Sequence, residues 1–367
     1  MSWIATTDLH SPLFNIRGIG VAPDAPGARP PLQPDEILAT GTMVMELRFN
    51  IDSGAEQTLI AYRRHSEWLR EVTVTLDSSG KLVLDIQQGR NQSRAEIGFP
   101  PPARDSRMRV SYAWNAPARS GFLTVELLDE GRMFQAEAFA PVPLPADDVR
   151  TMIRNGRHTR LAPFLTYLAF SNTVEPVGLG GGLVSGTKIE TPDGPRGVEK
   201  LRLGELVTTA TAGDLPVRWI GKRTVPSLGA FRPVKLRAPY FGLEDDVIAA
   251  PDQRMRLDIA DVEYQFGTEE ILLPAGHLAD GKRAQYLGRP RLVTYYQILL
   301  DVHDCLLHEG IWSESLFVGT LARHPALAKS TVLRGMPETA IPLHRDFANR
   351  RLNEYEARSI AAALQHA

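Results

Sequence analysis

Apolar and polar positions alternate with a period of two through most of the first half of the chain. In the segment TMVMELRFNID, residues 42–52, apolar side chains occupy every odd position from Met43 to Ile51, which is the pattern of a β-strand with one buried face. The alternation recurs in VTVTLDSSGKLVLDI, where Asp77–Gly80 separates two runs and predicts a hairpin turn. Residues 108–139 repeat the pattern again. Many short strands with turns between them predict a β-sandwich.

Helical spacing is confined to two short stretches. Residues 145–161 predict a short helix with two aspartates in its first turn, where carboxylates are favoured. Near the end of the chain, Asn353 and Glu356 have the spacing of a capping box, and apolar residues with helical spacing follow. The tail, residues 320–367, is amphipathic. It fits two alternatives, docking onto the preceding domain or binding a partner helix.

The length of 367 residues exceeds what one ordinary core accommodates and predicts two domains. The glycine-rich segment VGLGGG between the halves favours a linker, because a dinucleotide site would need a strand before it and a helix after it. The proline-rich residues 22–36 favour an extended loop. We therefore predict an all-β chain with four parts, namely a β-sandwich at 1–175, a linker at 176–182, a second β domain at 183–319 and a tail with a terminal helix at 320–367.

Composition narrows the range of partners without fixing a compartment. With 43% hydrophobic residues, 23% charged residues and a net charge of -2, the chain is typical of a soluble globular protein with no general attraction to nucleic acid or anionic membranes. No apolar run approaches the roughly 20 residues of a membrane span, and the first residues lack the pattern of a secretory signal. The single cysteine, Cys305, excludes an internal disulfide. Cytoplasmic location and secretion without a Sec signal peptide both remain open.

Five segments of the second half resemble a bacterial Hint domain, the module shared by hedgehog C-terminal halves and inteins. They are GLVSGTKIETPDGPRGVEKLRLGELV at 182–207, PVRWIGKR at 216–223, RPVKLRAPYFG at 232–242, EEILLPAGHLADG at 269–281 and YYQILLDVHDCLLHEGIWSES at 295–315. The segments follow the order of the family, and the resemblance extends over residues 178–319. It implies a Hint-type β fold. Residues 35–175 resemble laminin-G or concanavalin-like jelly rolls in pattern, without a site motif.

The resemblance also implies a site for self-cleavage, and this chain departs from it at two positions. The family places a nucleophilic Cys four residues before its Gly-Thr pair, which here is Gly182. The Thr/Ser-x-x-His block, whose His protonates the departing nitrogen for a gain of about 10²–10⁴-fold, corresponds to Ala250–Gln253. Gln253 cannot transfer a proton near neutral pH. By resemblance His303 is the histidine of the late segment, so we expect a vestigial site of Gly182, Ala250, Gln253 and His303 with Cys305 nearby, and no self-cleavage.

Alternative roles remain open for three of the candidate residues. His303 either binds or polarises a group in the former cleft or only satisfies local hydrogen bonds. Cys305 is two residues away and, in a strand, would share its face; a buried structural thiol is favoured over a nucleophile, because reactive cysteines need exposure and a lowered pKa. Ser185 is a weaker candidate nucleophile, because it would have to attack a different peptide bond.

No cofactor or metal is predicted. The aspartates at 245, 246, 252, 258 and 261 match no calcium loop and are typical of solvated turns. His277 favours packing at a strand end over metal binding.

Three functional classes therefore compete. The first is a noncatalytic binding or assembly protein with a protein partner or self-association. The second is a self-cleaving Hint protein with an atypical nucleophile. The third is a carbohydrate-binding protein, if Trp68, Tyr112 or Trp114 lines a groove and stacks on a glycan. Because these aromatic residues follow strand alternation, core packing is the favoured role for them.

Overall fold

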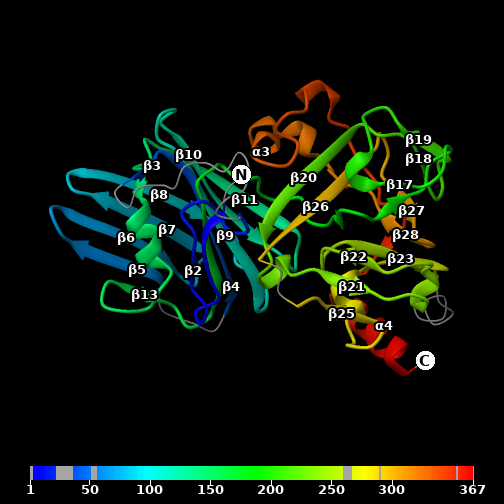
Figure 1. The fold of residues 1–367 in the computed structure, drawn as a ribbon, viewed down its shortest axis with the longest axis horizontal. Helices are drawn as coiled ribbons and strands as arrows, with labels where there is room; N and C mark the ends of the chain where they lie inside the picture. Colours follow the sequence, from blue (N-terminus) through cyan, green and yellow to red (C-terminus); the bar gives the residue numbers. More distant parts are fainter. Residues whose placement is uncertain are drawn as a thin grey trace. The chain divides into compact units, whose positions relative to one another are not determined.

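The computed structural model describes residues 3–21, 36–50, 56–258, 267–288, 291–352 and 354–366. It divides into two compact units, Met1–Val177 and Gly178–Ala367, which run from blue to green and from green to red in Figure 1. Strands hold 45% of the residues and helices only 12%, so the predicted all-β class is confirmed. Asn353, Asp261 and most of the proline-rich stretch, residues 22–35, lie outside the described residues.

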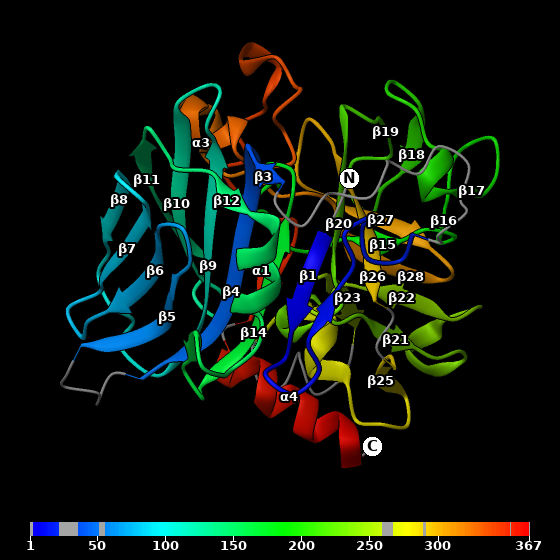
Figure 2. The same ribbon diagram turned by 60° about the vertical axis from the view of Figure 1, so that its left-hand side comes forward.

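The first unit is a β-sandwich, which confirms the fold predicted from the alternation (Figure 2). One sheet has, in spatial order, β11 (Arg132–Phe139), β10 (Ser120–Leu127), β9 (Ser106–Asn115), β4 (Thr40–Phe49), β14 (Leu165–Ser171), β1 (Trp3–Thr7) and β2 (Leu13–Phe14). The other has β13 (Thr159–Leu161), β5 (Gln57–His65), β6 (Leu69–Leu76), β7 (Lys81–Gln88) and β8 (Asn91–Gly98). A short pair joins β12 (Leu144–Pro145) to β3 (Ile37–Leu38), and α1 (Ala146–Met152) follows β12.

Two local predictions in this unit are confirmed. Asp77 accepts hydrogen bonds from the backbone N–H groups of Ser79 and Lys81, each at 2.9 Å, in the turn between β6 and β7. The predicted helix is α1, which carries its two aspartates in the first turn. Asp148 is fully buried and accepts hydrogen bonds from the Tyr62 hydroxyl at 2.7 Å and from Arg70 at 3.0 Å. This buried carboxylate fixes the helix to the five-stranded sheet.

The expectation that β4 buries one face is wrong. Its odd positions pack into the core as predicted, but Val44 and Glu46 on the other face are each only 2% exposed. On this second face Glu46 forms an ion pair at 3.4 Å with the buried Arg109 of the neighbouring strand β9. A charge that is paired in this way tolerates burial.

The aromatic residues weighed for glycan stacking lie mostly in the core. Tyr112 is 1% exposed and Trp114 is fully buried, with its indole N–H donating to the carbonyl of Leu38 at 2.9 Å. Core packing is therefore confirmed for both. Trp68 is 38% exposed, and the guanidinium of Arg70 lies 4.4 Å from the centre of its ring.

The second unit contains two larger sheets and a short strand pair. The six-stranded sheet has β20 (Trp219–Pro226), β26 (Leu292–Leu299), β15 (Leu183–Val184), β22 (Val247–Ala249), β21 (Val234–Leu236) and β25 (Ala284–Tyr286). The seven-stranded sheet has β17 (Arg196–Gly197), β16 (Lys188–Ile189), β27 (Cys305–His308), β28 (Ile311–Glu314), β23 (Arg254–Asp258), β24 (Glu270–Pro274) and β29 (Arg350–Arg351). The pair is β18 (Leu206–Thr208) with β19 (Asp214–Pro216).

Short helical segments connect and extend these sheets. They are η1 (Val198–Lys200), η2 (Gly229–Phe231), η3 (Tyr240–Gly242), η4 (Ala275–Leu278), η5 (Leu321–Arg323), α3 (Pro325–Lys329), η6 (Glu338–Ala340) and α4 (Glu354–His366). The terminal helix predicted for the tail is α4, drawn in red in Figure 1. Within the described ranges, no helix combines the length and apolar character needed to cross a membrane.

The tail docks onto the second unit, which is one of the two alternatives predicted for it. Leu352, Ala357 and Ile360 belong to the main core of the unit, together with strands of both sheets. Leu333 and Ile341 belong to a second apolar cluster. The tail also supplies β29, which pairs in parallel with β24. Residues 320–367 therefore complete the fold of this unit.

A buried histidine in the hairpin of β27 and β28 predicts sensitivity to acid. His308 is fully buried, and its Nε2 lies 2.7 Å from the hydroxyl oxygen of Ser313. Burial lowers the pKa of His308 from 6.5 to about 3. The unfolded chain therefore binds this proton more readily, so stability is fully present above pH 6.5 and is lost as the pH falls toward 3.

We expect the free energy of unfolding of the second unit to fall by up to about 1.4 kcal/mol per pH unit below pH 6.5 from this residue alone. Urea unfolding measured at pH 7, 6 and 5 checks this. The His308→Gln variant should flatten the dependence, whereas replacement of the exposed His324 by Gln should not. An equal slope in wild type and His308→Gln would show that another group dominates.

Candidate functional site

The candidate site is centred on Gly182, where the chain enters β15. The backbone N–H of Gly182 donates to Oε1 of Gln253 at 2.6 Å, and its carbonyl accepts from the N–H of Ala250 at 2.9 Å. Gln253 is 5% exposed, and its Nε2 donates to the carbonyl of Glu314 at 2.9 Å. The structure therefore brings together three of the residues selected from the sequence, Gly182, Ala250 and Gln253.

The backbone conformation at Gly182 suits glycine alone. Its φ is 125°, a value that residues with a side chain rarely adopt. A Cβ atom built there would lie 2.8 Å from Cβ of Tyr295 and 3.1 Å from the carbonyl oxygen of Tyr296. These contacts come from β26, which pairs with β15. Position 182 therefore has no side chain, and the surrounding residues leave no space for one.

The segment before Gly182 is held by side chains from two strands. Arg223 on β20 donates to the carbonyl of Gly178 at 3.2 Å. Gln297 on β26 donates through Nε2 to the carbonyls of Leu179 and Gly180, at 2.5 and 2.7 Å. Both side chains belong to residues less than a tenth exposed. Neither residue was selected from the sequence.

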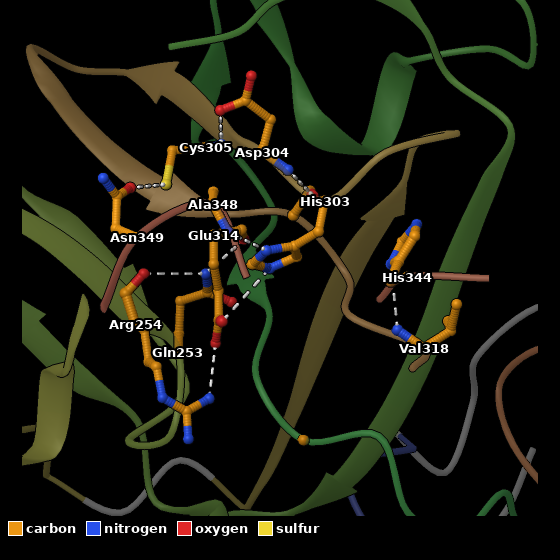
Figure 3. Close-up of polar contacts among 12 residues, drawn as sticks. Gln253, Arg254, His303, Asp304, Cys305, Glu314, Val318, His344, Ala348 and Asn349 are labelled. Atoms are coloured by element: carbon orange, nitrogen blue, oxygen red, sulfur yellow. Dashed lines mark hydrogen bonds and ion pairs between the residues drawn. The ribbon is translucent and has the colours of Figure 1, made fainter. Parts of the chain in front are cut away.

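His303 lies beside Glu314 and next to Ala348 of the tail (Figure 3). Its Nδ1 accepts the backbone N–H of Ala348 at 3.0 Å, and its Nε2 lies 3.6 Å from Oε2 of Glu314. Because Nδ1 is an acceptor, the neutral ring carries its proton on Nε2, which faces the carboxylate. The ring packs edge-on against Phe317, with centroids 5.1 Å apart. His303 therefore makes one local hydrogen bond, through Nδ1, while Nε2 faces the Glu314 carboxylate beyond hydrogen-bond distance.

Glu314 links this histidine to the strand that follows Gln253. Arg254 on β23 forms an ion pair with Glu314 at 2.9 Å. Burial acts to raise the pKa of Glu314, but the charge of Arg254 and the proximity of His303 hold it below its usual value. Arg351 from the tail is the second cation near this carboxylate. Its pKa is lowered to about 10, chiefly by burial and then by the charge of Arg254.

The expectation that His303 and Cys305 share a strand face does not apply, because β27 begins only at Cys305. In Figure 3 the imidazole points toward Glu314, whereas the thiol points toward Asn349. Sγ of Cys305 lies 3.6 Å from Oδ1 of Asn349. Cys305 is fully buried, and burial followed by the negative charge of Asp304 raises the pKa of its thiol. These observations favour a structural thiol.

The remaining candidates lie elsewhere in the second unit. Ser185 is exposed and hydrogen-bonds to Glu199, whose pKa is lowered first by the backbone N–H of Gly186. A carboxylate with a lowered pKa is a weak general base. His277 lies in η4, directly after the end of β24.

The aspartates do not form a metal site in the part of the chain that the structure describes, where no group of three or more potential ligands gathers. Asp246 instead pairs with Lys235 at 2.6 Å. Asp252 is exposed and lies over Gly180.

The comparison with family models identifies the domain that surrounds this site. Residues 182–320 match the model described as the Hint domain. The second unit contains a Hint domain. The match begins at Gly182, the residue placed at the cysteine position of the family, and ends where the tail begins. Within this Hint domain, the described site combines Gly182 and the Ala250–Gln253 block with Glu314 and His303.

Solved structures show only distant similarity. They include the gp41-1 intein (17% identity, 36% of this chain and 98% of that chain, TM-score 0.25). A second is the Ruminococcus gnavus IT-sialidase CBM40 bound to α2,6-sialyllactose, with 10% identity over 36% of this chain and 76% of that chain and a TM-score of 0.27. A third is the LG1–3 region of the laminin α2 chain, with 11% identity over 79% of this chain and 55% of that chain and a TM-score of 0.25. Because these TM-scores are low, the similarities support no conclusion about function. No curated protein matches the sequence significantly.

Proposed function

We propose that this protein is a noncatalytic binding and assembly module. Its Hint domain holds the peptide bond between Gly181 and Gly182, where the family is cleaved, without cutting it. The hydrogen bond from the N–H of Gly182 to Gln253 carries this proposal. Self-cleavage by the family's reaction needs a nucleophile on residue 182 and a proton donor facing the nitrogen of the same residue. Glycine supplies no nucleophile.

The direction of the hydrogen bond at Gly182 is opposite to the one that cleavage needs. The amide NH₂ of Gln253 is turned to the carbonyl of Glu314, so its oxygen is the atom that faces Gly182. A general acid must donate a proton to the departing nitrogen, but Gln253 accepts a hydrogen bond from it. This arrangement stabilises the intact peptide group.

The two alternative functions gain less support from the structure. Cys305 would need exposure and a lowered pKa to act as a nucleophile, but it is fully buried and its pKa is raised. Two of the three aromatic residues considered for glycan stacking, Tyr112 and Trp114, are buried in the core. Trp68 remains exposed enough to contact a ligand.

We expect the chain to remain covalently whole at 40.5 kDa after expression and after incubation with a thiol or hydroxylamine, which cleave thioesters. Native mass spectrometry of one sample checks both parts of the proposal. Denaturing conditions report the covalent mass, and native conditions report association with itself or with a co-purified protein.

A fragment that ends at Gly181 would contradict the noncatalytic role. A chain that is whole but monomeric and without a partner at every concentration would contradict the assembly role. Hydroxylamine treatment of a known thioester-forming protein serves as the positive control for the reagent.

A further inference from the structure

We infer that the Hint cleft is a binding site for a peptide of the form Leu-Gly-Gly-Gly, and that its occupant is this chain's own segment Leu179–Gly182. The inference rests on the proposed function, because the segment stays in place only in a chain that is not cut. It assigns the recognition of the segment to Arg223, Gln297 and the block Ala250–Gln253.

The cleft recognises the backbone of the segment. Arg223 and Gln297 together donate to three consecutive carbonyl groups, those of residues 178–180. Gln253 then accepts the N–H of Gly182. Buried donors such as these lose free energy when they are left without acceptors, so they favour an occupied cleft. Both ends of the segment are therefore fixed by hydrogen bonds that any sequence could make.

Selectivity comes from the space around the three glycines. A Cβ atom on Gly180 would lie 1.8 Å from a carboxylate oxygen of Asp252. One on Gly181 would lie 3.0 Å from Oε1 of Gln253, and Gly181 has a φ of 87°. At Gly182 the backbone of β26 closes the space, as described above. Each position thus favours glycine for a different reason: an exposed carboxylate that would have to move aside at Gly180, the positive φ at Gly181 and the packed strand β26 at Gly182.

Leu179 supplies the apolar contact that distinguishes this segment from glycine alone. It is packed against the cluster that contains Leu299, Leu316 and Val318. Its φ of 44° is unusual for a residue with a side chain and persists only when the surroundings hold it. The hydrogen bond from Gln297 to the carbonyl of Leu179 is one such restraint. The site therefore matches an uncharged, glycine-rich peptide with one leucine.

Two residues of the former proton-donor block now cover this peptide. Asp252 lies over Gly180, and Gln253 lies over Gly181 and Gly182. The block that serves cleavage in the family thus serves retention here.

Hydrogen exchange of the full-length chain tests the inference, with the amide of Gly182 as the readout. Gln297→Glu keeps the side-chain shape but places an oxygen against two carbonyl oxygens. We expect exchange at Gly182 to accelerate by about tenfold or more, since each lost hydrogen bond typically changes an opening equilibrium several-fold. Arg223→Met should have a smaller effect in the same direction. Lys222→Met is the matched control, because Lys222 is the exposed neighbour of Arg223 on β20.

A second pair of variants tests the selectivity for glycine. Gly180→Ala should also accelerate exchange at Gly182, and adding Asp252→Ala should restore it, because the carboxylate is the group that a Cβ atom would meet. Amides of β26 serve as the internal measure of whether each variant is folded. If the Arg223 or Gln297 variant loses hydrogen-exchange protection in β26, the milder substitution Arg223→Lys or Gln297→Asn is measured in its place.

The outcomes separate this inference from the proposed function. If Gly182 exchanges equally fast in wild type and in the folded Gln297 and Arg223 variants, or if Asp252→Ala gives no rescue, the peptide-site inference is wrong even though the chain is whole. A chain cut before Gly182 would overturn both proposals. Slow exchange that depends on Gln297 and Arg223, with rescue by Asp252→Ala, supports the site.

Discussion

Removal of residues 320–367 is expected to unfold the second unit and to leave the first unit folded. The tail contributes Leu352, Ala357 and Ile360 to the main core of the second unit. It supplies most of the smaller apolar cluster, including Leu333 and Ile341. Full burial of one large aliphatic side chain stabilises a fold by about 1.5–3 kcal/mol. Loss of several of them approaches the roughly 5–15 kcal/mol that separates a folded domain from its unfolded state.

Calorimetry and limited proteolysis of the truncated chain check this expectation. The full-length chain should retain a transition for the second unit that the truncated chain lacks, and fragments of 178–319 should be digested while 1–177 persists. Truncation after Ala362 is the matched control, because it keeps Leu352, Ala357 and Ile360. A truncated chain whose second unit melts as in the full-length protein would show that the tail is a separate appendage.

The tail shows where sequence patterns stop being informative. Its amphipathic spacing predicted α4, but spacing alone could not tell whether the apolar face packs onto this chain or onto a partner. That choice depends on contacts with strands more than 50 residues earlier, such as the pairing of β29 with β24. Ala357 and Ile360 of this face are buried in the core of the second unit. These two residues are therefore not available to a protein partner.

The strands were predictable where alternation is strong, and the burial of both faces of β4 was not. Periodicity identifies which residues share a face, but it does not show whether the polar face is buried as well. Glu46 and Arg109 look like solvent-facing residues in the sequence. Their pairing at 3.4 Å is what makes burial possible, and it joins residues from two strands that are distant in the chain.

The site was also predictable only in part, because a sequence pattern does not show which residues meet in space. Motif positions indicated Gly182 and Gln253, and the structure places them in contact. Arg223 and Gln297 carry no motif, because they act on backbone atoms that any sequence has. The alternation of β20 held one usable signal, since Gly221 and Val225 flank Arg223 on the same buried face. An arginine at such an inward position needs a partner, which here is the carbonyl of Gly178.

Gly182→Cys is expected to destabilise the second unit and to leave the chain uncut, even when combined with Gln253→His. Restoring the two missing groups would suffice if the cleft had otherwise kept its shape. However, a side chain at 182 must adopt a φ of 125° and enter the space of Tyr295. The backbone strain costs about 1–3 kcal/mol, and forcing extra atoms into a packed site adds about 1–3 kcal/mol.

Gly186→Ala separates these two costs. Gly186 also has a positive φ, 98°, but a Cβ atom there would meet no neighbouring atom within 4 Å. The difference in unfolding free energy between Gly182→Ala and Gly186→Ala therefore measures crowding by β26. We expect Gly182→Ala to be the more destabilising by at least about 1 kcal/mol in urea unfolding.

Mass spectrometry of the Gly182→Cys/Gln253→His chain, with and without added thiol, then decides between two explanations for the absence of cleavage. If the folded double variant is as stable as wild type and is cut between residues 181 and 182, the cleft lacks only two catalytic groups. If the variant is destabilised and whole, the packing around residue 182 has changed along with the chemistry. The close approach of Tyr295 and the hydrogen bonds to residues 178–180 favour the second explanation, in which the cleft is shaped to hold an intact glycine-rich peptide.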